Sequence, residues 1–193
     1  MVTGPLWLGA TNLAGDGQAD LVNHGGADKA ALAYGAARYD HWRADLPALD
    51  WAYGGFGENF TIAGDAGADG VDEEHVCIGD VYRIGEGEQA ARVQVSQPRQ
   101  PCWKLARRWE QTDLTARVHT TGYTGWYLRV LQEGEVAAGM PVTLLERRHP
   151  AWTVMRATQV MQDKGDVAGA RALGMLPELA TGWRDHLLRR AKV

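Results

Sequence analysis

Short runs of alternating apolar and polar residues dominate the first 150 positions of the chain. Runs of this kind predict strands that are buried on one face. The runs are residues 60–62 (FTI), 76–84 (VCIGDVYRI), 92–95 (RVQV), the WYLRVL segment after TGYTG, and 139–147 (GMPVTLLER). Because glycine-rich turns separate these short strands, the pattern is typical of a β-barrel or a β-sandwich.

Residues 29–46 (KAALAYGAARYDHWRADL) allow two interpretations. One continuous helix would place Tyr34, Arg38 and Trp42 on one face. Gly35 argues against that helix, so a strand over residues 29–34, a turn, and a helix over residues 36–45 is an equally good prediction. Pro47 ends the helix in either case.

Helical spacing replaces the alternating pattern twice in the second half of the chain. The segments CWKLARRWEQ and DLTARVHT are predicted helices, and the residues after Trp152 predict three short helices broken at 164–165 and 174–177. We place a domain boundary near Pro150. The predicted fold is mainly β with α: a β-barrel body over residues 1–149 and a small three-helix domain over residues 150–193.

Composition is that of a globular protein. Hydrophobic residues make up 45% and charged residues 23% of the 193 positions, which supplies enough apolar material for a core. No apolar run approaches the ~18 residues of a membrane helix, and the first residues lack the pattern of a signal peptide. We therefore expect a cytoplasmic protein. Its two cysteines are too few for a disulfide framework or a four-cysteine metal site.

Charge is distributed unevenly between the halves of the chain. Residues 1–90 carry a net charge of −11 and residues 91–193 a net charge of +7. Residues 92–108 hold five cations and no acid. Such a segment attracts anions, although most segments of this kind are simply solvated surface. The five cations are Arg92, Arg99, Lys104, Arg107 and Arg108.

Common signatures of catalytic and nucleotide-binding sites are missing. There is no phosphate-binding loop of the G-x-x-x-x-G-K-[ST] type and no G-x-S-x-G motif. The two G-x-G fragments enclose Asp16 and Glu86, whose carboxylates would repel a phosphate. No two of the six histidines stand at H-x-H or H-x-x-x-H spacing, so a histidine-built metal site is disfavoured.

Cys102 is the strongest candidate for chemistry. It follows two prolines in SQPRQPC and is predicted to lie in the first turn of a helix that begins near Pro101, where free backbone N–H groups favour a thiolate. Arg99 and Lys104 add positive charge on either side, as expected for a reactive or metal-binding cysteine. The alternative is an inert buried thiol, which is the interpretation that we favour for Cys77 in its apolar segment.

Two glycine-rich loops are candidate pocket walls. Residues 23–29 (NHGGADK) place a histidine and a cation beside a tight backbone, and residues 54–59 (GGFGEN) end in a polar pair. Free amides in such loops can bind oxyanions, but by composition both segments are more typical of ordinary turns.

Five segments together resemble the MOSC domain family, named after the C-terminal domain of molybdenum cofactor sulfurases, and in particular its bacterial YiiM-like branch. The core S-Q-P-R-x-P-C is the most specific of them. The resemblance covers residues 2–147, and the helical remainder is similar to the small domain that often follows in this branch. The segments, in family order, are GDGQADLVNHGGADKAALAY, GGFGENF, CIGDVYRIGE, VQVSQPRQPCWKL and TGYTGWYLRVL.

The resemblance implies a cationic pocket in which Cys102 binds the molybdenum of a pterin cofactor or carries sulfur. The cofactor has a phosphate and an oxyanionic metal centre, for which cationic side chains are suitable partners. The implied cofactor-binding residues are His24, Lys29, Asn59, Ser96, Arg99 and Lys104.

Two departures from the family pattern stand out. The chain opens at VTGPLWL, which matches the middle of the usual amino-terminal region, so we expect the first family strand to be shortened. The usual proline of the family H-G-G-P loop is Ala27 here, while the cation after Asp28 is retained as Lys29.

The resemblance implies a reductase of N-hydroxylated small molecules such as hydroxylamino bases, which would depend on the molybdenum cofactor. No flavin, nicotinamide or iron–sulfur motif is present, so electrons would come from a separate donor protein. No nucleic acid or membrane contact is needed. One alternative is a non-enzymatic carrier of the cofactor or of sulfur as a Cys102 persulfide, and another is a domain in which Cys102 is structural.

Overall fold

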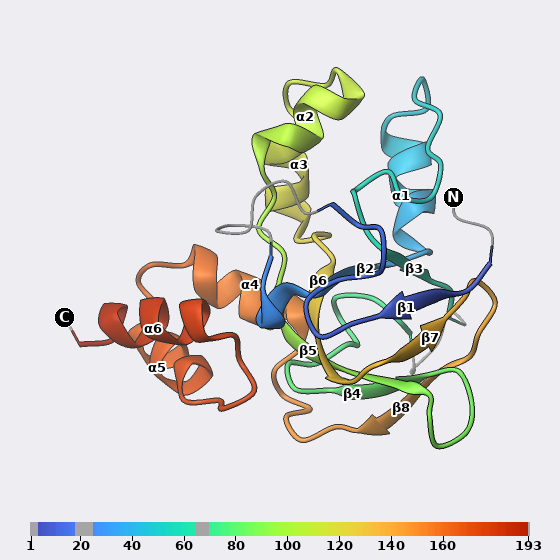
Figure 1. The fold of residues 1–193 in the computed structure, drawn as a ribbon. Coiled ribbons are helices and arrows are strands. Elements are labelled where there is room, and N and C mark those ends of the chain that lie inside the picture. Colours follow the sequence, from blue (N-terminus) through green and yellow to red (C-terminus); the bar gives the residue numbers. More distant parts are fainter. Residues whose placement is uncertain (1–3, 18–24, 65–69, 193) are drawn as a thin grey trace.

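A six-stranded sheet forms the centre of the molecule in a computed structural model that describes residues 4–17, 25–64 and 70–192. The strand order is β3-β2-β6-β5-β4-β8, and the sheet curls into half a barrel (Figure 1). Strands β2 and β3 run parallel, and the other neighbours are antiparallel. The strands are β2 (Ala31–Gly35), β3 (Phe60–Ile62), β4 (Val81–Ile84), β5 (Ala91–Pro98), β6 (Trp126–Gln132) and β8 (Val142–Glu146). A separate antiparallel pair joins β1 (Leu6–Leu8) to β7 (Gly134–Val136).

Helices lie in two groups around the sheet. Figure 1 shows α1, α2 and α3 standing together at the top of the view, with α4, α5 and α6 beside the sheet on the left. The helices are α1 (Arg38–Asp45), α2 (Trp103–Trp109), α3 (Leu114–Thr121), α4 (Val154–Gln162), α5 (Val167–Gly174) and α6 (Thr181–Arg190), with a 3₁₀ turn η1 (Ala27–Lys29). The predicted fold class, a β-rich body followed by three helices, is confirmed.

The ambiguous segment over residues 29–46 is a strand followed by a helix. Strand β2 ends at Gly35 and α1 begins at Arg38, so the single-helix alternative is wrong. A Cβ atom on Gly35 would lie 2.5 Å from the carbonyl oxygen of Val71. The close approach of these two backbones explains why glycine ends the strand.

Most predicted strands are confirmed, with one clear exception. Strand β3 has the predicted bounds, and β5 extends the predicted run at both ends. Residues 76–84 were predicted as one strand, but β4 begins only at Val81. Gly79 has a φ of +83°, and the buried carboxylate of Asp80 accepts a hydrogen bond from Cys77 N–H at 2.9 Å. These two residues make a turn before the strand begins.

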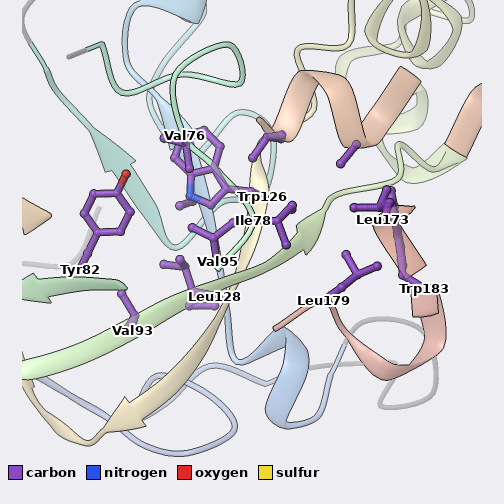
Figure 2. Packing of buried hydrophobic residues seen from close by; sticks show 14 of the residues in the cluster. Val76, Ile78, Tyr82, Val93, Val95, Trp126, Leu128, Leu173, Leu179 and Trp183 are labelled. Atoms are coloured by element: carbon purple, nitrogen blue, oxygen red, sulfur yellow. The ribbon is translucent and has the colours of Figure 1, made fainter. Parts of the chain in front are cut away.

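One hydrophobic cluster joins the sheet to the C-terminal helices. Figure 2 shows Val95 and Leu128 of the sheet and Leu173, Leu179 and Trp183 of the tail within it. All five side chains are buried. Burial of this shared surface holds the three helices against the body. The predicted breaks between the helices are confirmed, whereas the domain boundary near Pro150 stays a prediction.

A second, aromatic cluster lies under α1, α2 and α3. Phe56 stacks on Tyr34 with ring centroids 4.4 Å apart and on Trp51 at 5.4 Å. Leu105 of α2 is buried in the same cluster. The loop at residues 54–59 and the start of α2 are therefore held against each other by large apolar side chains.

Within residues 4–17, 25–64 and 70–192, no helix has the length and apolar character needed to cross a membrane.

Candidate functional site

A pocket of about 260 Å³ opens beside Cys102. It lies between the loop at residues 54–59, the turn that joins β5 to α2, and the neighbouring strands β2 and β6. We call it the Cys102 pocket. Five of the predicted site residues line it: Lys29, Asn59, Arg99, Cys102 and Lys104.

The turn from β5 into α2 fixes the position of Cys102. Strand β5 ends at Pro98, and the N–H of Arg99 donates to the carbonyl of Gly125 at 3.0 Å. Cys102 is the N-cap residue of α2, with φ −124° and ψ 164°, and the helix begins at Trp103. The cysteine thus stands one residue before the first turn in which it was predicted. Its carbonyl accepts hydrogen bonds from the N–H of Leu105 and the hydroxyl of Thr115.

Arg99 is the most buried cation in the wall of this pocket. It is only 8% exposed, and its Nη1 atom is buried with no hydrogen-bond partner among the described residues. A buried guanidinium nitrogen without an acceptor is unfavourable, because it has lost its water without replacement. An anion in the pocket would supply the missing acceptor.

Three further cations surround Arg99. Lys29 lines the pocket with its Nζ atom 5.8 Å from the ring centroid of Tyr127. Lys104 and Arg108 extend from the exposed face of α2. Since they stand four residues apart, they share one side of the helix. Sequence reasoning missed Arg108 as a site residue, although this spacing was visible.

Asn59 shapes the rim of the pocket with hydrogen bonds inside the protein. Its Oδ1 accepts from the N–H of Leu32 at 2.8 Å, and its Nδ2 donates to Asp16 at 2.9 Å. Asp16 itself lines the pocket and is the acid in its described wall. The sequence indicated that this carboxylate would repel a phosphate, so an anionic ligand has to lie nearer to Arg99 than to Asp16.

Ser96 lies beneath the pocket and does not line it. The side chain is fully buried, and its hydroxyl is within hydrogen-bond distance of the carbonyls of Asp28 and Tyr127. Ser96 therefore ties η1 to the sheet and supports Lys29 indirectly. A direct role of Ser96 in cofactor binding stays a prediction. His24 falls outside the described residues.

Four backbone amides of the glycine loop at residues 54–59 already donate hydrogen bonds within the protein. Glu58 accepts hydrogen bonds from the N–H groups of Gly54 at 2.8 Å and Phe56 at 3.1 Å. The N–H of Gly55 donates to the hydroxyl of Tyr39, and that of Gly57 to the carbonyl of Gly54. The oxyanion-binding interpretation is wrong for these four amides. Glu58, which sequence reasoning missed, instead holds the loop in shape.

Metal binding at this pocket would depend on the thiol. Among the described residues, no group of three or more histidine, cysteine, aspartate or glutamate side chains is arranged to hold a metal ion. Cys102 is half-buried. It offers one sulfur donor to a ligand that brings its remaining metal ligands with it.

Cys77 differs from Cys102 in its surroundings. It is 1% exposed, and its thiol lies 3.6 Å from the carbonyl oxygens of His75 and Pro150. Burial, with a further contribution from Asp80, raises the pKa of Cys77 to about 11. The prediction of a buried thiol is confirmed, although Cys77 lies in the turn before β4 and not in the strand.

These surroundings predict selective alkylation of Cys102 in the folded, cofactor-free protein. The nucleophile is the thiolate, and Cys77 is both inaccessible and protonated near neutral pH. Iodoacetamide labelling at pH 8, mapped by mass spectrometry, should modify Cys102 at least tenfold faster than Cys77. In a denaturant the two rates should converge. Faster labelling of Cys77 in the folded protein would contradict the assignment.

Known proteins resemble this chain in both sequence and structure. Residues 20–143 match the sequence model of the MOSC domain. The YflK protein of Bacillus subtilis is 42% identical over 93% of this chain and 76% of its own length. A reductase of Gibberella moniliformis is 35% identical over 82% of this chain, which spans only 27% of that protein. Protein YiiM of Escherichia coli is 37% identical over 76% of this chain and 62% of its own length.

Two solved structures share the fold over nearly the whole chain. YiiM from Geobacillus stearothermophilus superimposes with a TM-score of 0.83 and 32% identity, covering 98% of this chain and 86% of its own. YiiM from Escherichia coli gives a TM-score of 0.84 and 29% identity, covering 99% of this chain and 87% of its own.

Proposed function

This chain belongs to the MOSC domain family, and from that premise we propose that it binds the molybdenum cofactor through Cys102 and reduces N-hydroxylated small molecules. Hydroxylamino bases are the substrates that we propose first. A relative named as a reductase supports the class of reaction.

The observation that carries the proposal is the buried Nη1 atom of Arg99 in the wall of the Cys102 pocket, which has no hydrogen-bond partner among the residues that the structure describes. A cation in this state fits a ligand that brings an anionic oxygen, as the phosphate and the metal centre of the cofactor do. Lys29 and Lys104 line the same pocket and fit the same ligand. These cationic side chains therefore fit the molybdenum cofactor, which is the group that membership of the family implies.

Each residue has a distinct part in this proposal. Cys102 is the metal ligand, and the N-cap conformation and the Thr115 hydrogen bond orient it. Arg99 and the two lysines neutralise the charge of the cofactor and fix its position in the pocket. Phe56 and Leu105 exclude water from one wall. When bound, the cofactor supplies the oxygen-atom removal itself.

Electrons have to come from a second protein in this scheme. Conversion of R–NHOH to R–NH₂ and water takes two electrons and two protons, and the chain shows no motif for a second redox cofactor. We propose a small-molecule substrate and a separate electron-donor protein as partners in the cytoplasm, with no contact to nucleic acid or membrane.

The test measures the cofactor content of the purified protein and its turnover of a substrate. Protein purified from a host that makes the cofactor should contain molybdenum and pterin in equal amounts, and it should reduce 6-hydroxylaminopurine with an artificial electron donor. Bound cofactor without turnover would support the carrier alternative. Protein free of molybdenum and pterin would overturn the proposal.

A further inference from the structure

A second and larger cavity of about 830 Å³ lies beside the Cys102 pocket, between η1, the end of β5 and α6. We call it the α6 pocket. Gln97 and Gln100 line the α6 pocket, while Arg99 and Cys102, on the same turn of chain, line the Cys102 pocket. Lys29 lines both. One turn of backbone therefore separates the two cavities, and Lys29 stands where they meet.

Helix α6 presents positive charge to this cavity. Gly182, His186 and Arg189 line it and, at spacings of four and three residues, share one face of the helix. The side chains of His186 and Arg189 have no hydrogen bond or ion pair within the described part of the chain. Both are exposed in the cavity and available to a ligand.

The acid in the described wall of the α6 pocket is already neutralised. The carboxylate of Asp28 accepts hydrogen bonds from Nε of Arg129 at 2.8 Å and from the N–H of Thr181 at 3.0 Å. It also forms an ion pair with the same arginine. The cavity therefore keeps a net positive character toward a ligand.

The cavity is large enough for a small-molecule ligand. The volume falls within the range of about 300–1,000 Å³ that is usual for small-molecule sites. The start of α6 is joined to β5, because the N–H of Ala180 donates to the carbonyl of Ser96 at 2.8 Å. From there α6 runs outward (Figure 1), so Arg189 lies roughly 13 Å along the helix axis from that junction.

We propose that the α6 pocket binds the phosphate of a phosphorylated substrate, so that the protein acts on N-hydroxylated nucleotides in preference to free bases. This inference rests on the proposed function. The base of such a nucleotide reaches past Lys29, which lines both cavities, toward the Cys102 pocket, and its phosphate lies against His186 and Arg189. A free base fills only the inner part of the cavity and gains nothing from these two side chains.

Binding of adenosine 5′-monophosphate and of adenosine tests the proposal. Calorimetry on the full chain should show the monophosphate binding at least tenfold more tightly than the nucleoside. Arg189→Glu should remove that preference and leave adenosine binding unchanged. Lys192→Glu makes the same charge change at an exposed tail residue that does not line the cavity, and it should keep the preference.

A second variant blocks the cavity without changing its charge, which controls for an indirect effect of the charge change in Arg189→Glu. A Cβ atom on Gly182 meets no atom within 4 Å, so a side chain can start there without a clash. We expect Gly182→Leu to fold and to occupy part of the cavity. It should weaken binding of both ligands at least tenfold. Equal affinities of the wild type for the two ligands would overturn the proposal, and so would Arg189→Glu that still prefers the monophosphate.

The phosphate of the molybdenum cofactor is the other phosphate group that could occupy the α6 pocket. If the proposal is right, Arg189→Glu from a cofactor-making host retains the molybdenum content of the wild type. Loss of molybdenum in that variant would assign the cavity to the cofactor and overturn the proposal. The calorimetry is repeated on the full chain from a host that does not make the cofactor. Nucleotide binding in the α6 pocket does not depend on metal at Cys102, so this experiment tests it separately from the proposed cofactor binding.

Discussion

Cys102→Ser is expected to purify with a molybdenum content at background level. A serine hydroxyl is a harder donor than a thiolate and stays protonated near neutral pH, so it does not replace the sulfur ligand. The exchange barely changes the side-chain volume, and Cys102 is only half-buried, so the free energy of unfolding should hardly move. Metal analysis and urea unfolding of the same preparation measure both effects.

The matched control for this variant is Cys77→Ala. Cys77 is buried away from the Cys102 pocket and does not line it. It should retain the molybdenum content of the wild type, at a moderate cost in stability. A wild-type molybdenum content in Cys102→Ser would remove the central claim about the metal ligand.

Arg99→Ala is expected to weaken cofactor binding by about one to two orders of magnitude while leaving the thiol ligand in place. The substitution removes a charge-assisted hydrogen bond worth roughly 1.5–3 kcal/mol. Because Arg99 is 8% exposed, its contribution should change little between low and high salt. Equilibrium binding of isolated cofactor at two ionic strengths measures the effect.

Lys104→Ala provides the comparison. Lys104 lines the same pocket but is exposed, so its contribution should be smaller than that of Arg99 and should shrink as salt rises. An Arg99→Ala variant with unaltered affinity would contradict the role of Arg99 in cofactor binding.

Much of the fold follows from local patterns in the sequence. Strand β3 and the breaks between the tail helices come directly from alternation and from glycine and proline positions. The turn over residues 76–80 could not be predicted in this way. It depends on Asp80, whose carboxylate forms an ion pair with Arg147 at 2.7 Å, far along the chain. Periodicity within a short window carries no information about such a partner.

The candidate site was predictable where it rests on segments resembling a known family. Lys29, Asn59, Arg99 and Cys102 come from three distant segments, and the fold does bring them to one pocket. The role of Glu58 was not predictable. A carboxylate after a glycine loop gives no sign that it will bind the amides of that loop, because this depends on how the chain turns back.

Asp28 connects the two ends of the molecule. Its carbonyl lies against the Ser96 hydroxyl, its carboxylate holds Arg129 and the first turn of α6, and the next residue, Lys29, lines the Cys102 pocket. We therefore expect a ligand that fixes η1 to stabilise the contact between Asp28 and the first turn of α6, and this contact to favour the ligand to the same extent, because coupling between two binding events is reciprocal. Substitutions at the junction of α6 can then tune affinity at the Cys102 pocket without altering any residue that touches its ligand.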